Sequence, residues 1–364
     1  MQKKKFLLVA FATMLFAGSA LVSCSEDDPK TGGDDPKEFV AAGKNGAVVV
    51  NQGSYGQDLA SWGVFAYSDN STSYNLTLPG SLGNTPQNAV KVGDNFYVAD
   101  NAKGYLGVYD KSLNKTAEIA LKAPQGVTAA GDVVFAVSGD SVFAISTATN
   151  KKVGQVYAGS NIYALAVANN AVYVTQGMDW GNAEGAAQKN YVIKISLSSF
   201  NAGASVTSKR IEVGLNPYNQ IITDAQGNVF VVCAGDFGSF SGIESEVWKI
   251  DASDKSTKVA NGNYVAERNN VLFVVEKANS SKEYAFKTYK TSTGELLNKN
   301  FLSNATEQPK NVSFLGVNPY SGYIYFGSNE NGYKDNGFIY EYAADGAFVK
   351  KHNTGINPYS ILFY

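Results

Sequence analysis

The chain has 364 residues, a formal net charge of −2 and, among its hydrophobic residues, 22 Tyr and 20 Phe against 3 Met. A near-neutral chain without a basic stripe is not expected to bind nucleic acid, and the excess of Tyr and Phe over Met favours strands and binding surface over helix bundles. The length would be large for one ordinary core but suits an array of repeats.

The first 23 residues have the features of a lipoprotein signal peptide. Three lysines at positions 3–5 are followed by an apolar stretch at 6–20 and by the sequence Leu-Val-Ser-Cys at 21–24. This order is typical of a secretory signal, and its end resembles a lipobox, which predicts acylation of Cys24. The alternative, a transmembrane anchor, is disfavoured because no cationic residue directly follows Cys24 to stop transfer. An acyl group would anchor the protein to a membrane that the chain does not span.

Residues 24–40 are expected to form a flexible tether. The run Ser-Glu-Asp-Asp at 25–28 resembles the surface-export signal of Bacteroidetes lipoproteins, although a solvated linker has the same composition. Asp, Glu, Gly, Lys and Pro dominate up to Glu38, which is typical of disorder. Loss of the three signal lysines changes the net charge from −2 to −5. With Cys24 acylated, Cys233 is the one remaining cysteine, so no internal disulfide is expected.

A short phrase recurs along the rest of the chain. A proline or small residue is followed by Tyr or Gln, then by a small or polar residue and a hydrophobic run. The central residues of the seven copies are 38, 38, 55, 46, 46 and 49 positions apart: Gln87, Gln125, Tyr163, Tyr218, Tyr264, Lys310 and Tyr359. Repetition at this spacing is the signature of a propeller or another repeat array.

Each opening phrase leads an inner run, A, and further short runs with two-residue alternation follow it between Gly, Asn and Asp turns. The B runs are at 46–51, 94–99, 132–137, 171–175, 228–232, 271–275 and 323–327. The C runs are at 64–67, 104–109, 141–145, 191–195, 246–250, 284–289 and 337–342. Fourth runs, D, include 118–121, 152–157, 209–213 and 348–352. No stretch has helical periodicity beyond a turn or two.

The first repeat lacks an opening phrase, and the last phrase, at 357–364, lacks a following B run. Ring closure resolves both, because the C-terminal run can serve as strand A of the blade at 46–79. Closure also removes an exposed edge. The sequence therefore predicts an all-β fold, a seven-bladed β-propeller over residues 41–364 in which the C-terminal strand joins the N-terminal blade. The alternative, an irregular β-solenoid, would not need a split first repeat.

The longest connections gather on one predicted face. In a propeller the D–A and B–C connections emerge together, and the long ones here are B–C connections at 52–63, 176–190, 234–245 and 328–336. Insertions on one face mark a binding face. The opening phrases lie at the channel mouth on the same face. The predicted ligand-binding residues are Tyr55, Trp62, Gln87, Gln125, Tyr163, Trp180, Tyr218, Phe237, Lys310, Tyr333 and Tyr359.

For each aromatic the alternative role is packing between blades. Trp62 and Trp180 lie in polar stretches, which favours ligand contact for these two. Exposed aromatics supply contact area at low entropic cost, so the face suits a bulky, flat ligand with polar edges.

The residues do not favour catalysis. The single histidine, His352, lies in an outer run beside two lysines and is expected to be solvated. No His/Cys cluster has metal-ligand spacing, and no nucleophile elbow, phosphate loop or calcium loop is found. Acidic residues end several B runs, and a paired-carboxylate site is conceivable, although such residues more often serve in turns: Asp100, Asp140, Asp179 and Asp236. We expect no enzyme activity, no metal and no cofactor.

The chain from Cys24 resembles the YncE-like propeller lipoproteins of Bacteroides, and among them the surface lipoproteins that bind cobalamin (vitamin B12). The lipobox with its acidic run, the opening phrases such as Asn-Pro-Tyr-Asn at 216–219 and Asn-Pro-Tyr-Ser at 357–360, and the aromatic B–C insertions carry the resemblance. It implies an outer-membrane, surface-exposed protein that binds cobalamin as a transported ligand. The implied partner is a BtuB-like, TonB-dependent outer-membrane transporter.

Cobalamin is a wide disc edged with amides, with a phosphate on its nucleotide arm. Tyr and Gln side chains can bind amides, and Lys310 can meet the phosphate. Three alternatives remain open: a surface glycan-binding lipoprotein, because Trp and Tyr with Asn and Gln also suit sugars; a propeller enzyme such as a lyase; and a scaffold that binds protein alone.

Overall fold

The computed structural model describes residues 43–68, 71–177, 190–236, 243–277 and 283–364. The described residues belong to one compact unit, residues 39–364. The predicted signal peptide, Cys24 and the tether lie outside the described residues. No described helix is long and apolar enough to cross a membrane.

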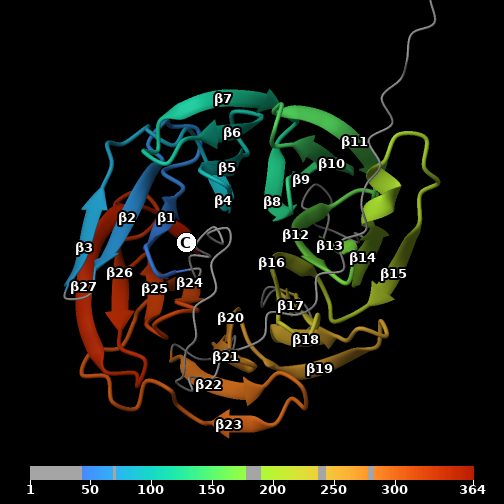
Figure 1. Cartoon of the computed structure of the whole chain (residues 1–364). Helices are drawn as coiled ribbons and strands as arrows, with labels where there is room; N and C mark the ends of the chain where they lie inside the picture. The colour runs from blue at the N-terminus through green and yellow to red at the C-terminus, as the bar shows by residue number, and fades with distance from the viewer. Residues whose placement is uncertain (1–42, 69–70, 178–189, 237–242, 278–282) are drawn as a thin grey trace, which may run out of the picture. The chain divides into compact units, whose positions relative to one another are not determined.

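The described chain forms seven four-stranded antiparallel sheets, each a blade whose strands run in order from the inside outward (Figure 1). Blades 1 to 3 are β28 (Pro358–Phe363), β1 (Gly46–Asn51), β2 (Ser61–Ser68), β3 (Ser71–Leu76); β4 (Pro86–Val92), β5 (Asn95–Asp100), β6 (Tyr105–Tyr109), β7 (Lys115–Ala120); and β8 (Pro124–Ala130), β9 (Val133–Ser138), β10 (Ser141–Ser146), β11 (Lys151–Tyr157).

Blades 4 to 7 continue the same order. They are β12 (Ile162–Ala168), β13 (Ala171–Gln176), β14 (Tyr191–Ser196), β15 (Ser208–Glu212); β16 (Pro217–Thr223), β17 (Val229–Cys233), β18 (Glu246–Ile250), β19 (Ser256–Asn261); β20 (Tyr264–Arg268), β21 (Val271–Glu276), β22 (Ala285–Lys290), β23 (Leu296–Asn298); and β24 (Val312–Val317), β25 (Ile324–Ser328), β26 (Asn336–Tyr342), β27 (Phe348–Ile356). A 3-10 turn at Leu197–Phe200 lies between β14 and β15.

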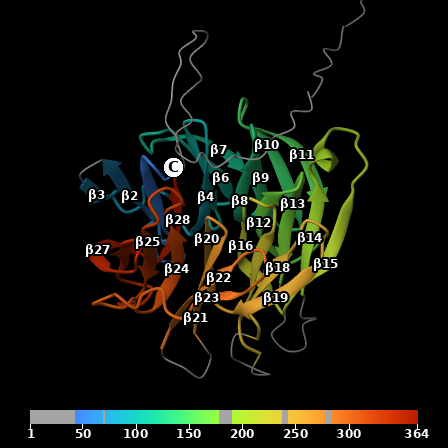
Figure 2. The same cartoon turned by 60° about the horizontal axis from the view of Figure 1, so that its bottom comes forward.

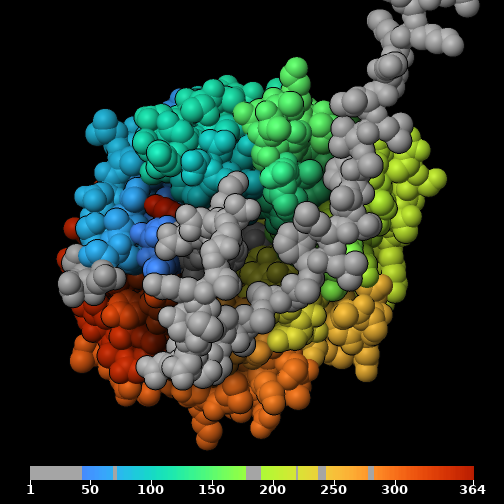
Figure 3. All heavy atoms as spheres, viewed as in Figure 1, coloured from blue at the N-terminus to red at the C-terminus, as the bar shows by residue number. Residues whose placement is uncertain are grey.

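The predicted seven-bladed propeller is confirmed, including its closure. β28 pairs antiparallel with β1, from Ala47 opposite Phe363 to Asn51 opposite Pro358. The blades follow one another around the ring in chain order, so that the C-terminal colours meet the N-terminal ones (Figure 3). Blade 1 therefore consists of the last strand of the chain and the first three.

Burial explains the strand compositions. The second strand of each blade is covered on both sides by neighbouring blades, and all six residues of β13 are buried. Such a strand reads as a continuous apolar run instead of an alternating one. The outer strand β7 has four exposed residues, because one of its faces meets solvent. Seven buried clusters, one at each blade interface, form the core.

A residue with left-handed backbone precedes six of the inner strands. These residues are Thr85, Ala123, Asn161, Asn216, Asn311 and Asn357, with φ between 42° and 62°. The left-handed region costs little for Asn, whose short polar side chain bonds locally, and four of the six are followed by Pro. The structural basis of the opening phrase is thus the turn that brings the chain from an outer strand to the next inner strand.

Side-chain amides join neighbouring inner strands around the channel. Asn88 of β4 donates to the Val127 carbonyl and accepts from the Val127 N–H, both at 2.9 Å. Gln220 of β16 makes the same pair of bonds with Val265 at 3.0 and 2.9 Å. The inner strands lie side by side around the centre (Figure 2), but each one forms backbone hydrogen bonds of a β-sheet only with the second strand of its own blade. These bonds satisfy inner-edge backbone groups that would otherwise be unpaired.

The closing interface between blades 7 and 1 contains a buried polar network. His352 Nε2 lies 2.7 Å from Glu341 Oε2, and the Tyr325 hydroxyl donates to Glu341 Oε1 at 3.2 Å. The Tyr67 hydroxyl donates in turn to Tyr325 at 3.1 Å, and burial raises the pKa of Tyr67 to about 12. The expectation of a solvated His352 is wrong: the residue is 7% exposed because Phe65 and Tyr74 cover its ring.

Candidate functional site

The two ends of the blades differ in their connections. The D–A and B–C connections emerge at one end, which we call the loop face, and the A–B and C–D turns emerge at the other, the turn face. The B–C connections of blades 1, 4, 5, 6 and 7 span residues 52–60, 177–190, 234–245, 277–284 and 329–335, whereas those of blades 2 and 3 span 101–104 and 139–140. The predicted gathering of long connections on one face is confirmed, and blade 6 adds one that the sequence reading missed.

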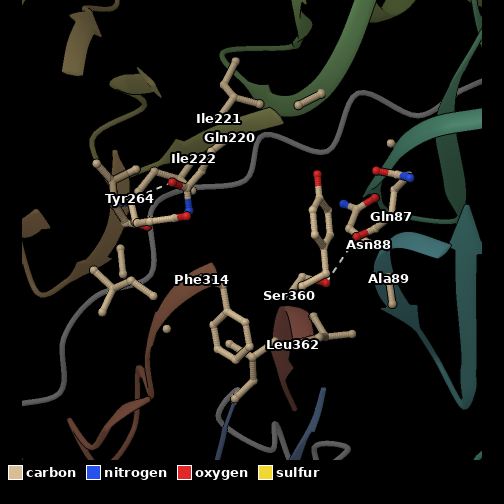
Figure 4. A pocket seen from close by; sticks show the side chains of 18 of the residues that line it. Gln87, Asn88, Ala89, Gln220, Ile221, Ile222, Tyr264, Phe314, Ser360 and Leu362 are labelled. Carbon is tan, nitrogen blue, oxygen red and sulfur yellow. Dashed lines mark hydrogen bonds between the residues drawn. The ribbon is translucent and has the colours of Figure 1, made fainter. Parts of the chain in front are cut away.

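A cavity of about 450 Å³ lies on the axis and is lined by all seven inner strands (Figure 4). Gln87, Gln125, Tyr264 and Tyr359 line its mouth, because each is the first or second residue of its inner strand and so lies at the loop face. The mouth therefore presents amide groups, which both donate and accept, beside phenol rings.

Below its mouth the channel is lined by both aliphatic and polar residues of the inner strands. The aliphatic ones include Leu165, Ile221, Leu315 and Ile361, and the polar ones include Asn88, Gln220, Ser313 and Ser360. Glu267 lies toward the turn face, where burial raises the pKa of its carboxyl and its Oε1 accepts from the Asn270 N–H at 2.7 Å. At the loop-face end, Gln87 and Gln125 offer a polar ligand both hydrogen-bond donors and acceptors.

Tyr163 and Tyr218 pack against each other instead of lining the cavity. Their ring centroids are 4.5 Å apart in an edge-to-face arrangement, and Tyr163 is 9% exposed. Burial raises the pKa of Tyr218 above its ordinary value. The predicted placement of Tyr163 at the channel mouth is therefore wrong; blade packing, the alternative role, applies to it.

A second hollow lies on the loop face between blades 6 and 7. Two cavities of about 430 and 610 Å³ share Tyr284, Asn311 and Glu330 in their linings, and we call them together the blade 6/7 groove. Tyr333, 70% exposed, and Lys277 complete the smaller cavity. This groove combines aromatic rings with amide and charged groups.

Contacts within the fold hold the side chains of the groove in place. The Tyr264 hydroxyl donates to the Val312 carbonyl at 2.7 Å, and the Tyr284 hydroxyl accepts from the Val312 N–H at 3.1 Å. Burial opposes ionisation of Glu330, but bonds from Tyr340 and Lys351 outweigh it and lower the pKa of its carboxyl. Glu330 is thus an ionised, already partnered group, with Lys351 Nζ at 2.9 Å.

The predicted ligand contact of Trp62 is wrong. Trp62 lies in β2 and not in the preceding connection, is 0% exposed, and packs against Phe96 and Tyr109 at ring-centroid distances of 5.9 and 5.5 Å. The polar neighbours in sequence belong to the loop, whereas the indole fills the interface between blades 1 and 2.

We expect Trp62→Phe to lower the unfolding free energy by about 1–3 kcal/mol, as measured in urea titrations. The same variant should keep its ligand affinity within twofold of the unmodified chain. A tenfold loss of affinity in a folded variant would contradict this prediction.

Lys310 does not occupy the position inferred from the repeat. Left-handed Asn311 corresponds to Asn357, so that Ser313 takes the place of Tyr359. Lys310 precedes β24, is exposed, and lines the larger cavity of the blade 6/7 groove instead of the channel mouth. The proline at 309 misplaced the phrase by three residues, because blade 7 has Val312 where four of the other copies have Pro.

The remaining predicted residues divide into two groups. Tyr55 and Tyr333 lie in loop-face connections and are 83% and 70% exposed, and Ser54 of the first connection donates to the Tyr333 carbonyl at 3.4 Å. Trp180, Phe237, Asp179 and Cys24 lie outside the described residues.

The described acidic residues have structural partners. Asp100 accepts from the Asn84 and Lys103 backbone N–H groups at 3.0 and 3.2 Å, Asp140 accepts from Ser141 at 2.9 Å, and Asp236 is buried. These contacts agree with a role in turns, which the sequence analysis gave as the alternative to a paired-carboxylate site. Within the described ranges, no group of three His, Cys, Asp or Glu side chains is arranged to hold a metal ion.

Sequence reasoning missed Lys277, Tyr284 and Asn329. A register-based signal was present, because the residue directly after each B strand starts a loop-face connection. Read in register, these residues are Gln52, Asn101, Gly139, Gly177, Ala234, Lys277 and Asn329. At this position blades 1, 2, 6 and 7 have Gln, Asn or Lys, whereas blades 3, 4 and 5 have Gly or Ala. The four polar residues belong to consecutive blades around the ring and so lie on one side of the loop face.

No protein-family model matches the chain, and no curated protein matches its sequence. Solved structures do match. A functionally unknown protein from Desulfotomaculum acetoxidans DSM 771 has a TM-score of 0.60 at 13% identity over 88% of this chain and 98% of that chain. Hydrazine synthase from Kuenenia stuttgartiensis has a TM-score of 0.54 at 14% identity, over 73% of this chain and 85% of that chain. AztD from Citrobacter koseri has a TM-score of 0.50 at 10% identity, over 86% of this chain and 85% of that chain. At such identities the likeness establishes the fold alone: the chain is a seven-bladed β-propeller similar to these proteins in architecture.

Proposed function

We propose that this protein is a non-catalytic surface lipoprotein that captures cobalamin on its loop face and passes it to a TonB-dependent outer-membrane transporter. The observation that carries the proposal is the channel mouth, where Gln87, Gln125, Tyr264 and Tyr359 surround a cavity on the face with the longest connections. The resemblance of the signal segment and opening phrases to cobalamin-binding surface lipoproteins supplies the choice of ligand.

The chemistry of the mouth fits a disc edged with carboxamides. Gln side chains donate and accept, so each can pair with an amide of either orientation. Tyr rings provide flat contact area with a polar tip.

The attachment point of the chain is compatible with surface display. Gly43 leads into β1 at the turn face, and its carbonyl accepts from Asn318 of the blade 7 A–B turn at 2.9 Å. The covalent connection to residues 1–42 is therefore at the opposite end of the blades from the loop face. We propose lipidation at Cys24 and an outer-membrane location on the cell surface.

The proposal is tested by calorimetric titration of the full chain, purified in detergent, with cyanocobalamin. We expect one-to-one binding that is weakened at least tenfold, about 1.4 kcal/mol, when Tyr359→Ser and Gln125→Ala are combined. The Ser mimics blade 7, which carries Ser313 at this position. Tyr320→Ser is the matched control, because this tyrosine is 55% exposed on the turn face. Unchanged affinity in the double variant, or no heat with the unmodified chain, would reject cobalamin capture at this mouth.

A surface glycan-binding function is the second candidate. Tyr55 and Tyr333 are highly exposed rings on joined connections of the loop face, and such rings also stack on sugars. Binding to one member of a polysaccharide panel, lost in Tyr55→Ala with Tyr333→Ala, together with no binding of cobalamin, would select this function over the first.

A further inference from the structure

A buried amide oxygen in the blade 6/7 groove has no partner among the described residues. Asn329 is 5% exposed and lines the smaller cavity, yet its Oδ1 accepts no hydrogen bond from the part of the chain that the structure describes. A buried acceptor that makes no hydrogen bond has lost its bonds to water without compensation, which destabilises the unliganded protein. A ligand that places an N–H or O–H group at this oxygen removes that cost.

A relay of amide hydrogen bonds across the ring closure orients Asn329 in the structure. Its Nδ2 donates to Asn357 Oδ1 at 2.9 Å, and Asn357 Nδ2 donates to Gln52 Oε1 at 2.7 Å. With Asn357 in this orientation, reversal of Asn329 alone would place two oxygens against each other. In this arrangement the Asn329 oxygen is the acceptor that has no partner among the described residues.

Lys277 brings an unmatched positive charge to the same cavity. Its Nζ lies 5.4 Å from the centroid of the Tyr284 ring, and its backbone N–H donates to Asn263 at 2.6 Å. No carboxylate in the described ranges lies within ion-pair distance of this ammonium group. Glu330, the carboxylate common to both cavities, is already bound by Lys351. A partly buried cation that has no counter-ion among the described residues favours an anionic ligand group.

We propose that the blade 6/7 groove is a subsite for a phosphodiester flanked by an amide or hydroxyl donor. Resting on the proposed function, this subsite holds the phosphate-bearing arm of cobalamin while the channel mouth holds the macrocycle. Lys277 pairs with the phosphate, Asn329 Oδ1 accepts from the adjoining donor, and the exposed ring of Tyr333 offers a stacking surface at the rim.

The test compares two corrinoids that differ in this arm. Cyanocobalamin contains the phosphate and nucleotide, and cobinamide lacks both. Each is titrated into the full chain and into Lys277→Gln, with Lys334→Gln as the control. Lys334 is an exposed lysine of the same face that does not line the groove, so both variants change the net charge equally.

We expect Lys277→Gln to lower cyanocobalamin affinity about tenfold and cobinamide affinity by less than twofold, with Lys334→Gln affecting neither. Added salt should reduce the difference in affinity between cyanocobalamin and cobinamide, because salt screens a partly exposed ion pair. Equal losses for both corrinoids, or no loss for either, would overturn the subsite while leaving cobalamin capture intact. Failure of the unmodified chain to bind either corrinoid would instead reject the proposed function and the subsite with it.

Discussion

Removal of residues 358–364 is expected to prevent stable folding of the propeller. These residues contain β28, which supplies the inner strand of blade 1 and completes the channel wall. Without β28 the backbone edge of β1 is left unpaired, and the closing interface loses Ile361 and Phe363, which pack against its core. Full burial of a large apolar side chain contributes about 1.5–3 kcal/mol. Loss of these two partly buried side chains together with the β1–β28 pairing therefore removes a large fraction of the stability of a typical protein, about 5–15 kcal/mol.

The measurement is a thermal melt by circular dichroism with size-exclusion chromatography. The truncated chain should show no cooperative transition and should elute as aggregate, because an open edge templates association. Adding a synthetic peptide of residues 356–364 should restore a transition by strand addition, whereas a scrambled peptide should not. A truncated chain that melts like the full chain would show that the ring does not depend on this closure.

Glu341→Leu is expected to lower the unfolding free energy by about 3–5 kcal/mol. Glu341 is 2% exposed and binds His352 through one carboxylate oxygen and Tyr325 through the other. The substitution leaves both partners buried without an acceptor, which costs more than the hydrogen bonds themselves contribute. Glu341→Gln keeps an oxygen for Tyr325 and an N–H for His352, so its effect should be much smaller.

A double-mutant cycle separates the pair from its surroundings. Glu341→Leu combined with His352→Phe removes both polar partners, and we expect it to recover more than half of the loss, since a buried pair can often be replaced by apolar residues of similar volume. Glu118→Leu is the matched control, because Glu118 pairs with Lys115 at 2.5 Å on the surface, with side chains 48% and 40% exposed; such pairs contribute about 0–1 kcal/mol. A loss below about 1 kcal/mol in Glu341→Leu, read from urea titrations, would contradict a structural role for the pair.

The fold followed from local rules that tolerate errors of position. Strand alternation, turn residues and repetition predict seven blades even when individual runs are displaced by a few residues, as at β7, expected at 118–121 and found at Lys115–Ala120. Closure could be predicted because the incomplete first repeat and the unmatched final phrase supply complementary parts of one blade. Both inferences need only the order of the runs along the chain.

The individual site residues depended on register and on contacts between blades, which neighbours in sequence do not encode. Trp62 follows a polar loop but points into the interface of blades 1 and 2. His352 follows two lysines but is covered by Phe65 and Tyr74 of the blade across the closure. Lys310 needed the left-handed turn at Asn311 to fix its register. Thus the sequence by itself determined the blade count, the closure and the face with the long connections. Only the tertiary structure decided which side chains meet at the channel mouth and in the blade 6/7 groove, because those side chains come from strands and loops of different blades.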